Sequence, residues 1–144
     1  MKYTCEVTID LPRARVVELF DSIKNLAKWQ PGLLGFDHVS GEPGEPGAKS
    51  RLVYEERGRE TEMFETIIRR DLPDAFMALY EAKGVKNWCT HFFKEDGPDK
   101  ARWVMENEFK FRGLMSIFGL VMRSAFPKQT LSDMNRFKAF AEGA

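Results

Sequence analysis

The sequence predicts an α+β fold in which a curved antiparallel sheet of seven strands wraps around a long, kinked C-terminal helix. Residues 2–9 and most of residues 34–111 alternate between apolar and polar side chains, as half-buried strands do. Residues 114–141 instead carry apolar side chains at spacings of three and four, which is the helical period. A helix of this length needs an apolar surface to pack on, and a strongly curved sheet provides one.

The first elements are a strand and two short helices. Residues 2–9 place Tyr3, Cys5, Val7 and Ile9 on one side, which indicates a strand with one buried face. Pro12 suits the first turn of a helix, and the apolar spacing of residues 16–20 predicts that helix. A second helical turn is predicted over residues 21–27.

Six further strands are predicted, each bounded by Gly, Pro or Asp residues that favour turns. They cover residues 34–41, 49–56, 61–70, 76–83, 87–95 and 101–111. The final helical segment contains Pro127, which lacks a backbone donor and clashes with the preceding turn. We therefore expect a kink at Pro127, or two helices end to end.

The charge and the targeting signals exclude several classes of protein. The chain of 144 residues has the size of a single domain, and its 22 basic and 22 acidic residues give a formal net charge of zero. It therefore has no overall basic field for nucleic acid or an acidic membrane. The longest apolar tract, Leu114–Phe126, is too short to span a bilayer, and the N-terminus has no signal-peptide core. We expect a cytoplasmic protein without stable membrane insertion.

Neither a metal nor a cofactor is predicted. Cys5 and Cys89 are too few for a disulfide framework, and we expect two buried, reduced thiols. The spacing of His38 and His91 relative to these cysteines does not match a metal site. The sequence also lacks a phosphate-binding loop, a dinucleotide fingerprint and a nucleophile elbow.

The turns predict which side chains share a face, because directly opposed residues on paired strands point the same way. We expect two-residue turns at 58–59 and 84–85, and four-residue loops at 71–74 and 96–99. On the last strand the large apolar side chains, including Trp103 and Met105, must face the helix. Carried through these turns, this rule puts His91 on the outer face. It predicts an inward face composed of Arg51, Val53, Phe64, Thr66, Ile68, Met77, Leu79, Glu81, Trp88, Thr90, Phe92, Trp103, Met105 and Asn107.

Two stretches resemble a known superfamily. They are Ile9-Asp10-Leu11-Pro12 with Leu19-Phe20-Asp21 and Trp29-Gln30-Pro31-Gly32, and the tail Gln129-Thr130-Leu131-Ser132-Asp133-Met134 with Phe137-Lys138. Together with the element order, they resemble the START-like, or SRPBCC, superfamily with its helix-grip fold, and most closely its polyketide cyclase/dehydrase-type branch. The resemblance implies an apolar cavity between sheet and helix. Members range from carriers to cyclases to co-chaperones, so the resemblance does not settle the function.

We expect a binding or carrier protein for a small hydrophobic ligand, a lipid or a polyketide-like aromatic, held in that cavity. The alternative to a cavity is an interior filled by aromatic side chains. Val121, Met122 and Ala125 are expected to close the cavity from the helix. The full set of predicted ligand contacts is Val53, Phe64, Thr66, Leu79, Glu81, Trp88, Thr90, Phe92, Trp103, Met105, Asn107, Val121, Met122 and Ala125.

Two other functions remain open. The first is a cyclase or dehydratase that orients a poly-β-ketone chain in the same cavity. There Glu81 is a candidate general acid or base, Asn107 can polarise a carbonyl, and Arg51 either handles protons or neutralises Glu81. The second is a protein-interaction module that resembles the co-chaperone branch and uses the helix surface.

The segment 114–126 is apolar on nearly every side, which is more than one packing face requires. Its side chains must cover something else: the cavity, a partner subunit or a transient membrane contact. We expect either a homodimer through residues 114–126 or a gate over the cavity.

Overall fold

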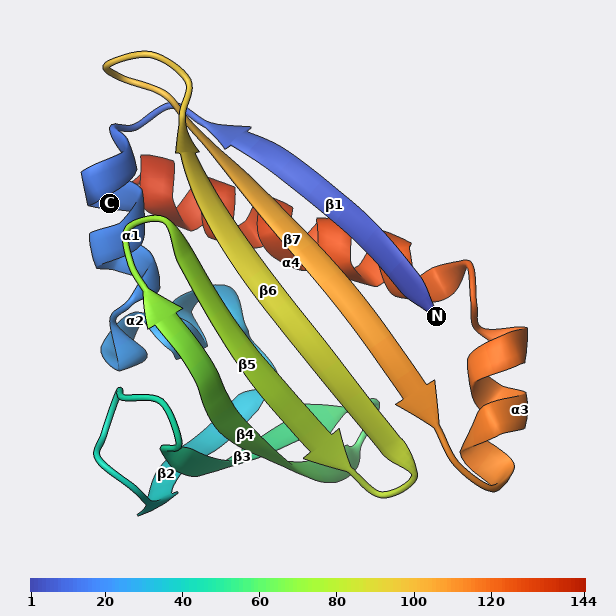
Figure 1. The fold of residues 1–144 in the computed structure, drawn as a ribbon. Coiled ribbons are helices and arrows are strands. Elements are labelled where there is room, and N and C mark those ends of the chain that lie inside the picture. Colours follow the sequence, from blue (N-terminus) through green and yellow to red (C-terminus); the bar gives the residue numbers. More distant parts are fainter.

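A computed structural model describes residues 1–144 and has the predicted α+β architecture (Figure 1). One antiparallel sheet contains all seven strands, two short helices follow the first strand, and two helices end the chain. In chain order the elements are β1 (Lys2–Ile9), α1 (Arg13–Phe20), α2 (Ile23–Trp29), β2 (Leu33–Ser40), β3 (Lys49–Glu56), β4 (Arg59–Asp71), β5 (Ala75–Ala82), β6 (Val85–Glu95), β7 (Ala101–Phe111), α3 (Leu114–Val121) and α4 (Ala125–Glu142).

The sheet has the strand order β1-β7-β6-β5-β4-β3-β2. From β2 to β7 each strand pairs with the next along the chain, whereas β1 pairs with β7 at the edge, with Lys2 opposite Glu108 and Ile9 opposite Ala101. Figure 1 shows the sheet curving around α4, whose C-terminal end lies beside α1. The long helix therefore occupies the concave side of the sheet.

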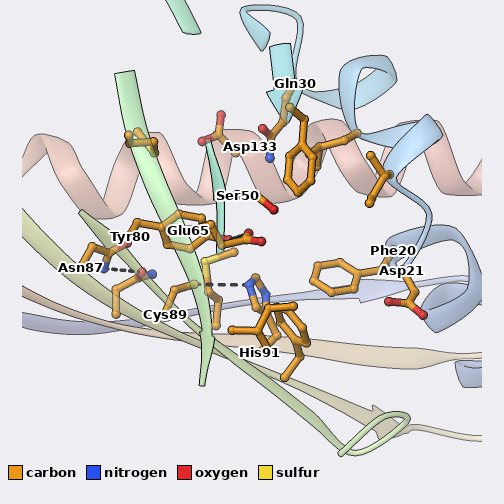
Figure 2. Close-up of a pocket in the computed structure, with 18 of the residues that line it drawn as sticks. Phe20, Asp21, Gln30, Ser50, Glu65, Tyr80, Asn87, Cys89, His91 and Asp133 are labelled. Atoms are coloured by element: carbon orange, nitrogen blue, oxygen red, sulfur yellow. Dashed lines mark hydrogen bonds between the residues drawn. The ribbon is translucent and has the colours of Figure 1, made fainter. Parts of the chain in front are cut away.

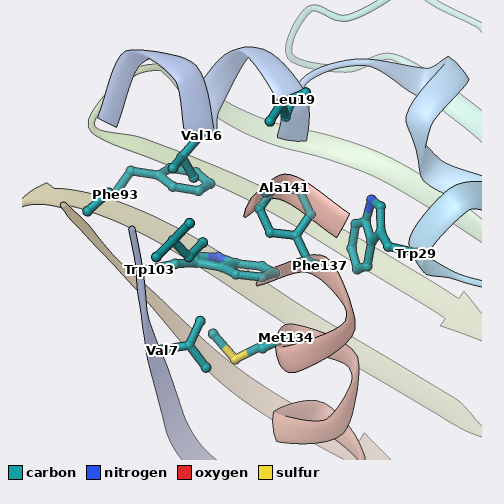
Figure 3. Close-up of a cluster of buried hydrophobic side chains, with 11 residues drawn as sticks. Val7, Val16, Leu19, Trp29, Phe93, Trp103, Met134, Phe137 and Ala141 are labelled. Atoms are coloured by element: carbon teal, nitrogen blue, oxygen red, sulfur yellow. The ribbon is translucent and has the colours of Figure 1, made fainter. Parts of the chain in front are cut away.

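The hydrophobic core is concentrated at one end of this concave side (Figure 3). Trp103 on β7 is fully buried at its centre, and its ring lies 5.0 Å from that of Phe137 on α4. Phe93 stacks on Trp103 at 6.2 Å, and Trp29 from α2 meets Phe137 edge-on at 5.2 Å. These rings join α2 and α4 to the β6–β7 end of the sheet.

The β6–β7 connection differs from the prediction by one residue. Glu95 opposes Ala101, so the loop has five residues, 96–100, and it is closed by the Asp96 N–H, which donates to the Lys100 carbonyl at 2.9 Å. Trp103 therefore pairs with Phe93 instead of Phe92. Because side chains alternate along a strand, a slip of one residue moves every side chain of the preceding strands to the opposite face.

The other connections preserve the predicted facing. The two-residue turns lie at 57–58 and 83–84, each one residue earlier than predicted, which moves the pairing by two residues and leaves the faces unchanged. A three-residue connection at 72–74 is compensated by an irregularity at Ile68, so that Phe64 opposes Glu81. The facing error therefore arises at the β6–β7 loop alone.

The prediction of which side chains face inward is therefore wrong for β3 to β6 and right for β7. On β7, Trp103, Met105 and Asn107 lie on the concave side as predicted, and His91 on β6 lies there too, contrary to the prediction. The structure places on the convex face the residues Arg51, Val53, Phe64, Thr66, Met77, Leu79, Glu81, Trp88, Thr90 and Phe92.

The C-terminal segment forms two helices, which is one of the two expected arrangements. The break lies at residues 122–124 and not at Pro127, which is the third residue of α4, where a missing N–H costs no intrahelical hydrogen bond. Helix α3 turns away beyond the end of the sheet (Figure 1), and Val121 is 74% exposed. Val121, Met122 and Ala125 therefore do not close the cavity. None of the four helices combines the length and the apolar character needed to cross a bilayer.

Candidate functional site

A cavity of about 470 Å³ lies between the concave face of the sheet and α4 (Figure 2). Of the 31 residues that line it, 17 are hydrophobic, so its wall is mainly apolar. Thr130 and Asp133 of α4 close one side, and Pro43 and Gly44 of the loop after β2 contribute to the rim. Small-molecule sites enclose roughly 300–1,000 Å³, so the interior is not filled by its own aromatic side chains.

Only some of the residues predicted from the sequence meet in this cavity. Met105 and Asn107 lie in its wall, and Trp103 lies in the core beside it. The predicted contacts on β3 to β6 lie outside the cavity, because those strands present the opposite face. Glu81 and Arg51 are therefore not placed for chemistry in the cavity. On the convex side the Glu81 carboxylate lies 3.7 Å from Lys86 Nζ, and Arg51 pairs with Glu62 and Asp37.

A buried acid that the sequence analysis missed lies in the wall. Tyr80 of β5 donates its hydroxyl hydrogen to Glu65 Oε2 of β4 at 2.8 Å. Burial raises the pKa of the Glu65 carboxyl, opposed in part by this hydrogen bond, and burial also raises the pKa of Tyr80 well above its usual value. The pair can donate protons or hydrogen bonds inside a largely apolar space.

His91 of β6 forms a second buried polar group. The Trp103 indole N–H donates to His91 Nδ1 at 3.0 Å, and His91 Nε2 lies 3.3 Å from Cys89 Sγ. Because an indole nitrogen is only a donor, Nδ1 accepts and the neutral ring carries its hydrogen on Nε2. Burial lowers the pKa of His91 to about 3 and raises that of Cys89 to about 12, so both groups are uncharged at neutral pH.

Asn107 of β7 offers a free donor. Its Oδ1 accepts a hydrogen bond from Asn87 Nδ2 at 3.1 Å, which fixes the orientation of the amide. Its own Nδ2 has no partner, although the residue is only 5% exposed. Buried polar groups are nearly always hydrogen-bonded, so an unpartnered donor in a cavity wall indicates a position where a ligand oxygen can bind.

Three hydroxyl groups and one carboxyl group complete the polar lining, two of them on α4 and the others on β1 and β3. The Tyr3 hydroxyl and Thr130 Oγ1 share a hydrogen bond of 2.7 Å, and Tyr54 donates to Gln30 Oε1 at 2.7 Å. Burial raises the pKa of Tyr3 to about 12 and also raises the pKa of Asp133. Burial therefore favours the uncharged forms of Tyr3 and Asp133.

The rim carries an ion pair. Arg70 of β4 donates two hydrogen bonds to the Asp21 carboxylate, at 2.8 and 2.6 Å, in the bidentate geometry that favours this pair. The hydrogen bond to Asp21 raises the pKa of Arg70 further. This pair joins the end of α1 to β4 and neutralises the charges at the rim. The chain has no group of three or more His, Cys, Asp or Glu side chains that could hold a metal ion.

Comparison with known proteins rests on structure. No protein-family model matches the sequence, and no curated protein sequence is significantly similar to it. A START superfamily protein from Mycobacterium smegmatis superposes with a TM-score of 0.82 at 11% identity, covering 99% of this chain and 97% of that one. The ZhuI aromatase/cyclase from Streptomyces superposes with a TM-score of 0.80 at 13% identity, covering 99% and 93%.

The chain has the START-like, helix-grip fold. Norcoclaurine synthase from Thalictrum flavum, in complex with dopamine and hydroxybenzaldehyde, shares it with a TM-score of 0.74 at 14% identity, covering 97% of this chain and 85% of that one. The fold class predicted from the sequence is thus confirmed, and the resemblance to the START-like superfamily is confirmed at the level of the fold. Proteins with this START-like fold include both binding proteins and enzymes, so the function of this chain has to be inferred from its own cavity.

Proposed function

We propose that this START-like chain binds and carries a small, hydrophobic, uncharged molecule, such as a lipid or a polyketide-like aromatic, between the sheet and α4. The observation that carries the proposal is a mainly apolar cavity of about 470 Å³ in which burial shifts the titratable groups of the interior towards their uncharged forms. A charged ligand loses its hydration in such a space without gaining a counter-ion. A neutral ligand avoids that cost.

The polar groups define what the ligand carries. Asn107 Nδ2 is a free donor, and a carbonyl or hydroxyl oxygen on the ligand would satisfy it. Glu65 and Tyr80, on the neighbouring strands β4 and β5, provide a second polar position. One or two oxygen functions on an otherwise apolar molecule match this arrangement. Hydroxybenzaldehyde, one of the two molecules bound to norcoclaurine synthase, is an aromatic ring with two oxygen functions, which supports a ligand of this class for the fold.

The free thiols agree with a reducing compartment, and we place the carrier in the cytoplasm. Cys5 and Cys89 are both unpaired, and Cys89 is buried. Disulfides are rare in cytosolic proteins, where thiols are kept reduced.

Binding of 2-naphthol and 2-naphthoate tests the charge preference. The two probes have the same ring system but differ in charge at pH 7. We expect the neutral naphthol to bind at least roughly tenfold more tightly, because burying a carboxylate without a partner is costly. Quenching of tryptophan fluorescence measures both affinities, since Trp29 lines the cavity. Equal affinities, or tighter binding of the carboxylate, would contradict the proposal.

The Asn107→Leu variant tests the free donor. It is expected to weaken naphthol binding by about tenfold, the value of one buried hydrogen bond. Glu106→Gln is the matched control, because Glu106 is adjacent on β7 and exposed on the opposite face. Native mass spectrometry of the purified protein would also detect a small molecule that co-purifies, and its mass would narrow the ligand class.

A cyclase or dehydratase reaction is the second candidate, favoured by Glu65. A carboxyl with a raised pKa, hydrogen-bonded to Tyr80 in an apolar cavity, is suited to general acid catalysis. These two residues take the roles that the sequence analysis gave to Glu81 and Arg51. Under this function Glu65→Gln would abolish turnover of a short β-polyketone while naphthol still binds. Glu60→Gln, in the exposed start of β4, is the control. A carrier would show no turnover in any of these proteins.

A further inference from the structure

Helix α3 carries an exposed apolar surface that the fold does not use. Six of the eleven large hydrophobic side chains that the protein exposes lie within residues 114–122. We call this set the α3 patch: Leu114, Ile117, Phe118, Leu120, Val121 and Met122. Leu114 is 86% exposed and Leu120 is 70% exposed. Concentrated exposure of this kind marks an interaction site, whereas single exposed apolar residues do not.

The opposite side of α3 holds the helix in place. A Cβ atom on Gly119 would lie 2.6 Å from the Phe111 ring, so only glycine allows α3 to approach β7 this closely. Met115 packs against Gly84 in the β5–β6 turn, and the Ser116 hydroxyl donates to the Phe111 carbonyl at 3.2 Å. These contacts hold α3 on β7 without the most exposed residues of the α3 patch, and the only hydroxyl of this helix is already used.

The charges around the patch are basic. Between Glu108 and Asp133 the chain has four basic residues, Lys110, Arg112, Arg123 and Lys128, and no acidic residue. Arg112 and Arg123 lie just beyond the two ends of α3, and Arg123 lines a groove of about 380 Å³ together with Lys2 and Leu120. The nearby acids Glu108 and Glu81 are already paired with Lys2 and Lys86. A chain of zero net charge therefore has a local excess of positive charge at this end.

We propose that the α3 patch docks this protein on the surface of an anionic lipid bilayer. The apolar side chains would enter the boundary between headgroups and acyl chains, and Arg112 and Arg123 would contact lipid phosphates. A second copy of the chain fits less well, because a two-fold contact through the patch would bring the same arginines together. A protein interface also needs directional polar groups, and the outward side of α3 has none.

The docked end lies close to the cavity. The Phe118 ring lies 6.3 Å from that of Phe126, and Phe126 lies 5.0 Å from Phe109, which lines the cavity. Docking would place this end of the cavity at the bilayer. The proposal concerns the surface, and its test does not depend on which ligand, if any, the cavity holds.

Vesicle flotation provides the test, with phosphatidylcholine vesicles that contain or lack phosphatidylglycerol. The wild-type chain is expected to bind the anionic vesicles, and binding should weaken as salt is raised. Leu120→Ser with Val121→Ser should lower binding at least roughly tenfold, because two apolar side chains no longer leave water. Arg112→Gln with Arg123→Gln should lower it by roughly tenfold or more at low salt. Leu34→Ser with Val39→Ser is the matched control, since both residues are 53% exposed on β2, away from α3.

Three results would overturn this proposal. Failure of the wild-type chain to bind either vesicle type excludes docking through α3, and so does binding of the Leu120/Val121 variant at the wild-type level. Light scattering that shows a dimer, dissociated by the Leu120/Val121 substitutions, would identify a second copy as the occupant. Naphthol binding measured on the same variants separates the two proposals, because the α3 substitutions should leave it unchanged.

Discussion

Phe93→Ala is expected to lower the free energy of unfolding by about 4 kcal/mol, whereas Phe92→Ala should lower it by no more than about 1 kcal/mol. Phe93 is 1% exposed and packs between Trp103 and Phe20, with ring separations of 6.2 and 5.0 Å. Removing its ring leaves a cavity in the core, whereas Phe92 lies on the convex face, where it is only partly buried and water can fill the space its ring leaves. Urea unfolding of the two variants measures both values.

The two substitutions control for each other, because they make the same chemical change at neighbouring positions of β6. The four-residue loop predicted from the sequence would pair Phe92 with Trp103 and place Phe92 in the core. A larger loss of stability for Phe92→Ala than for Phe93→Ala would therefore support that register and contradict the five-residue loop seen in the structure.

Acidification is expected to destabilise the protein through His91. Burial lowers the pKa of His91 to about 3, and the ordinary value is 6.5. Between these values the unfolded chain binds a proton that the folded protein excludes, so the stabilising contribution is complete above pH 6.5 and is lost as the pH falls towards 3. At about 1.4 kcal/mol per pH unit, lowering the pH from 6.5 to 4 should remove roughly 3 kcal/mol.

The His91→Gln variant isolates this effect. The glutamine amide oxygen can still accept the hydrogen bond from the Trp103 indole, but the side chain does not titrate. Glu65 acts in the opposite direction, because its raised pKa lowers stability as the pH rises above 4.5. Because both proteins contain Glu65, its contribution cancels when the pH dependence of the His91→Gln variant is subtracted from that of the wild type. Urea unfolding at pH 6.5 and pH 4 is the measurement, with His38→Gln on the exposed strand β2 as the control. Equal pH dependence in wild type and His91→Gln would contradict the assignment.

The convex face explains why the apolar pattern could not identify the inward side. Both faces of β6 carry apolar side chains, with Trp88 and Phe92 on one and Cys89 and Phe93 on the other. On the outside, Lys110 covers the Trp88 ring at 5.4 Å, and Lys49 covers the Phe64 ring at 5.5 Å. Such contacts let aromatic residues remain at the surface. Apolar character alone therefore predicted a cavity wall on the wrong side of four strands.

The polar residues of the cavity were missed for the same reason. Glu65, Tyr80, Asn87 and His91 alternate with the residues that were predicted to face inward. The pattern that would have indicated them is this second alternating set, once it is linked to Met105 and Asn107 on β7. Linking the two sets requires the length of the loop that begins at Asp96, and the residues 96–100 are compatible with either four or five loop positions.

The amino-acid sequence by itself determined the order and approximate limits of the strands and helices and the START-like fold class. Hydrophobic periodicity is a local property, and each element displays it within its own residues. Only the tertiary structure decided which face of β3 to β6 points inward, where the C-terminal helix breaks and that α3 remains exposed. These features depend on contacts between distant residues, such as Phe93 with Trp103 and Gly119 with Phe111, and a difference of one residue in a loop reverses the facing of every strand before it.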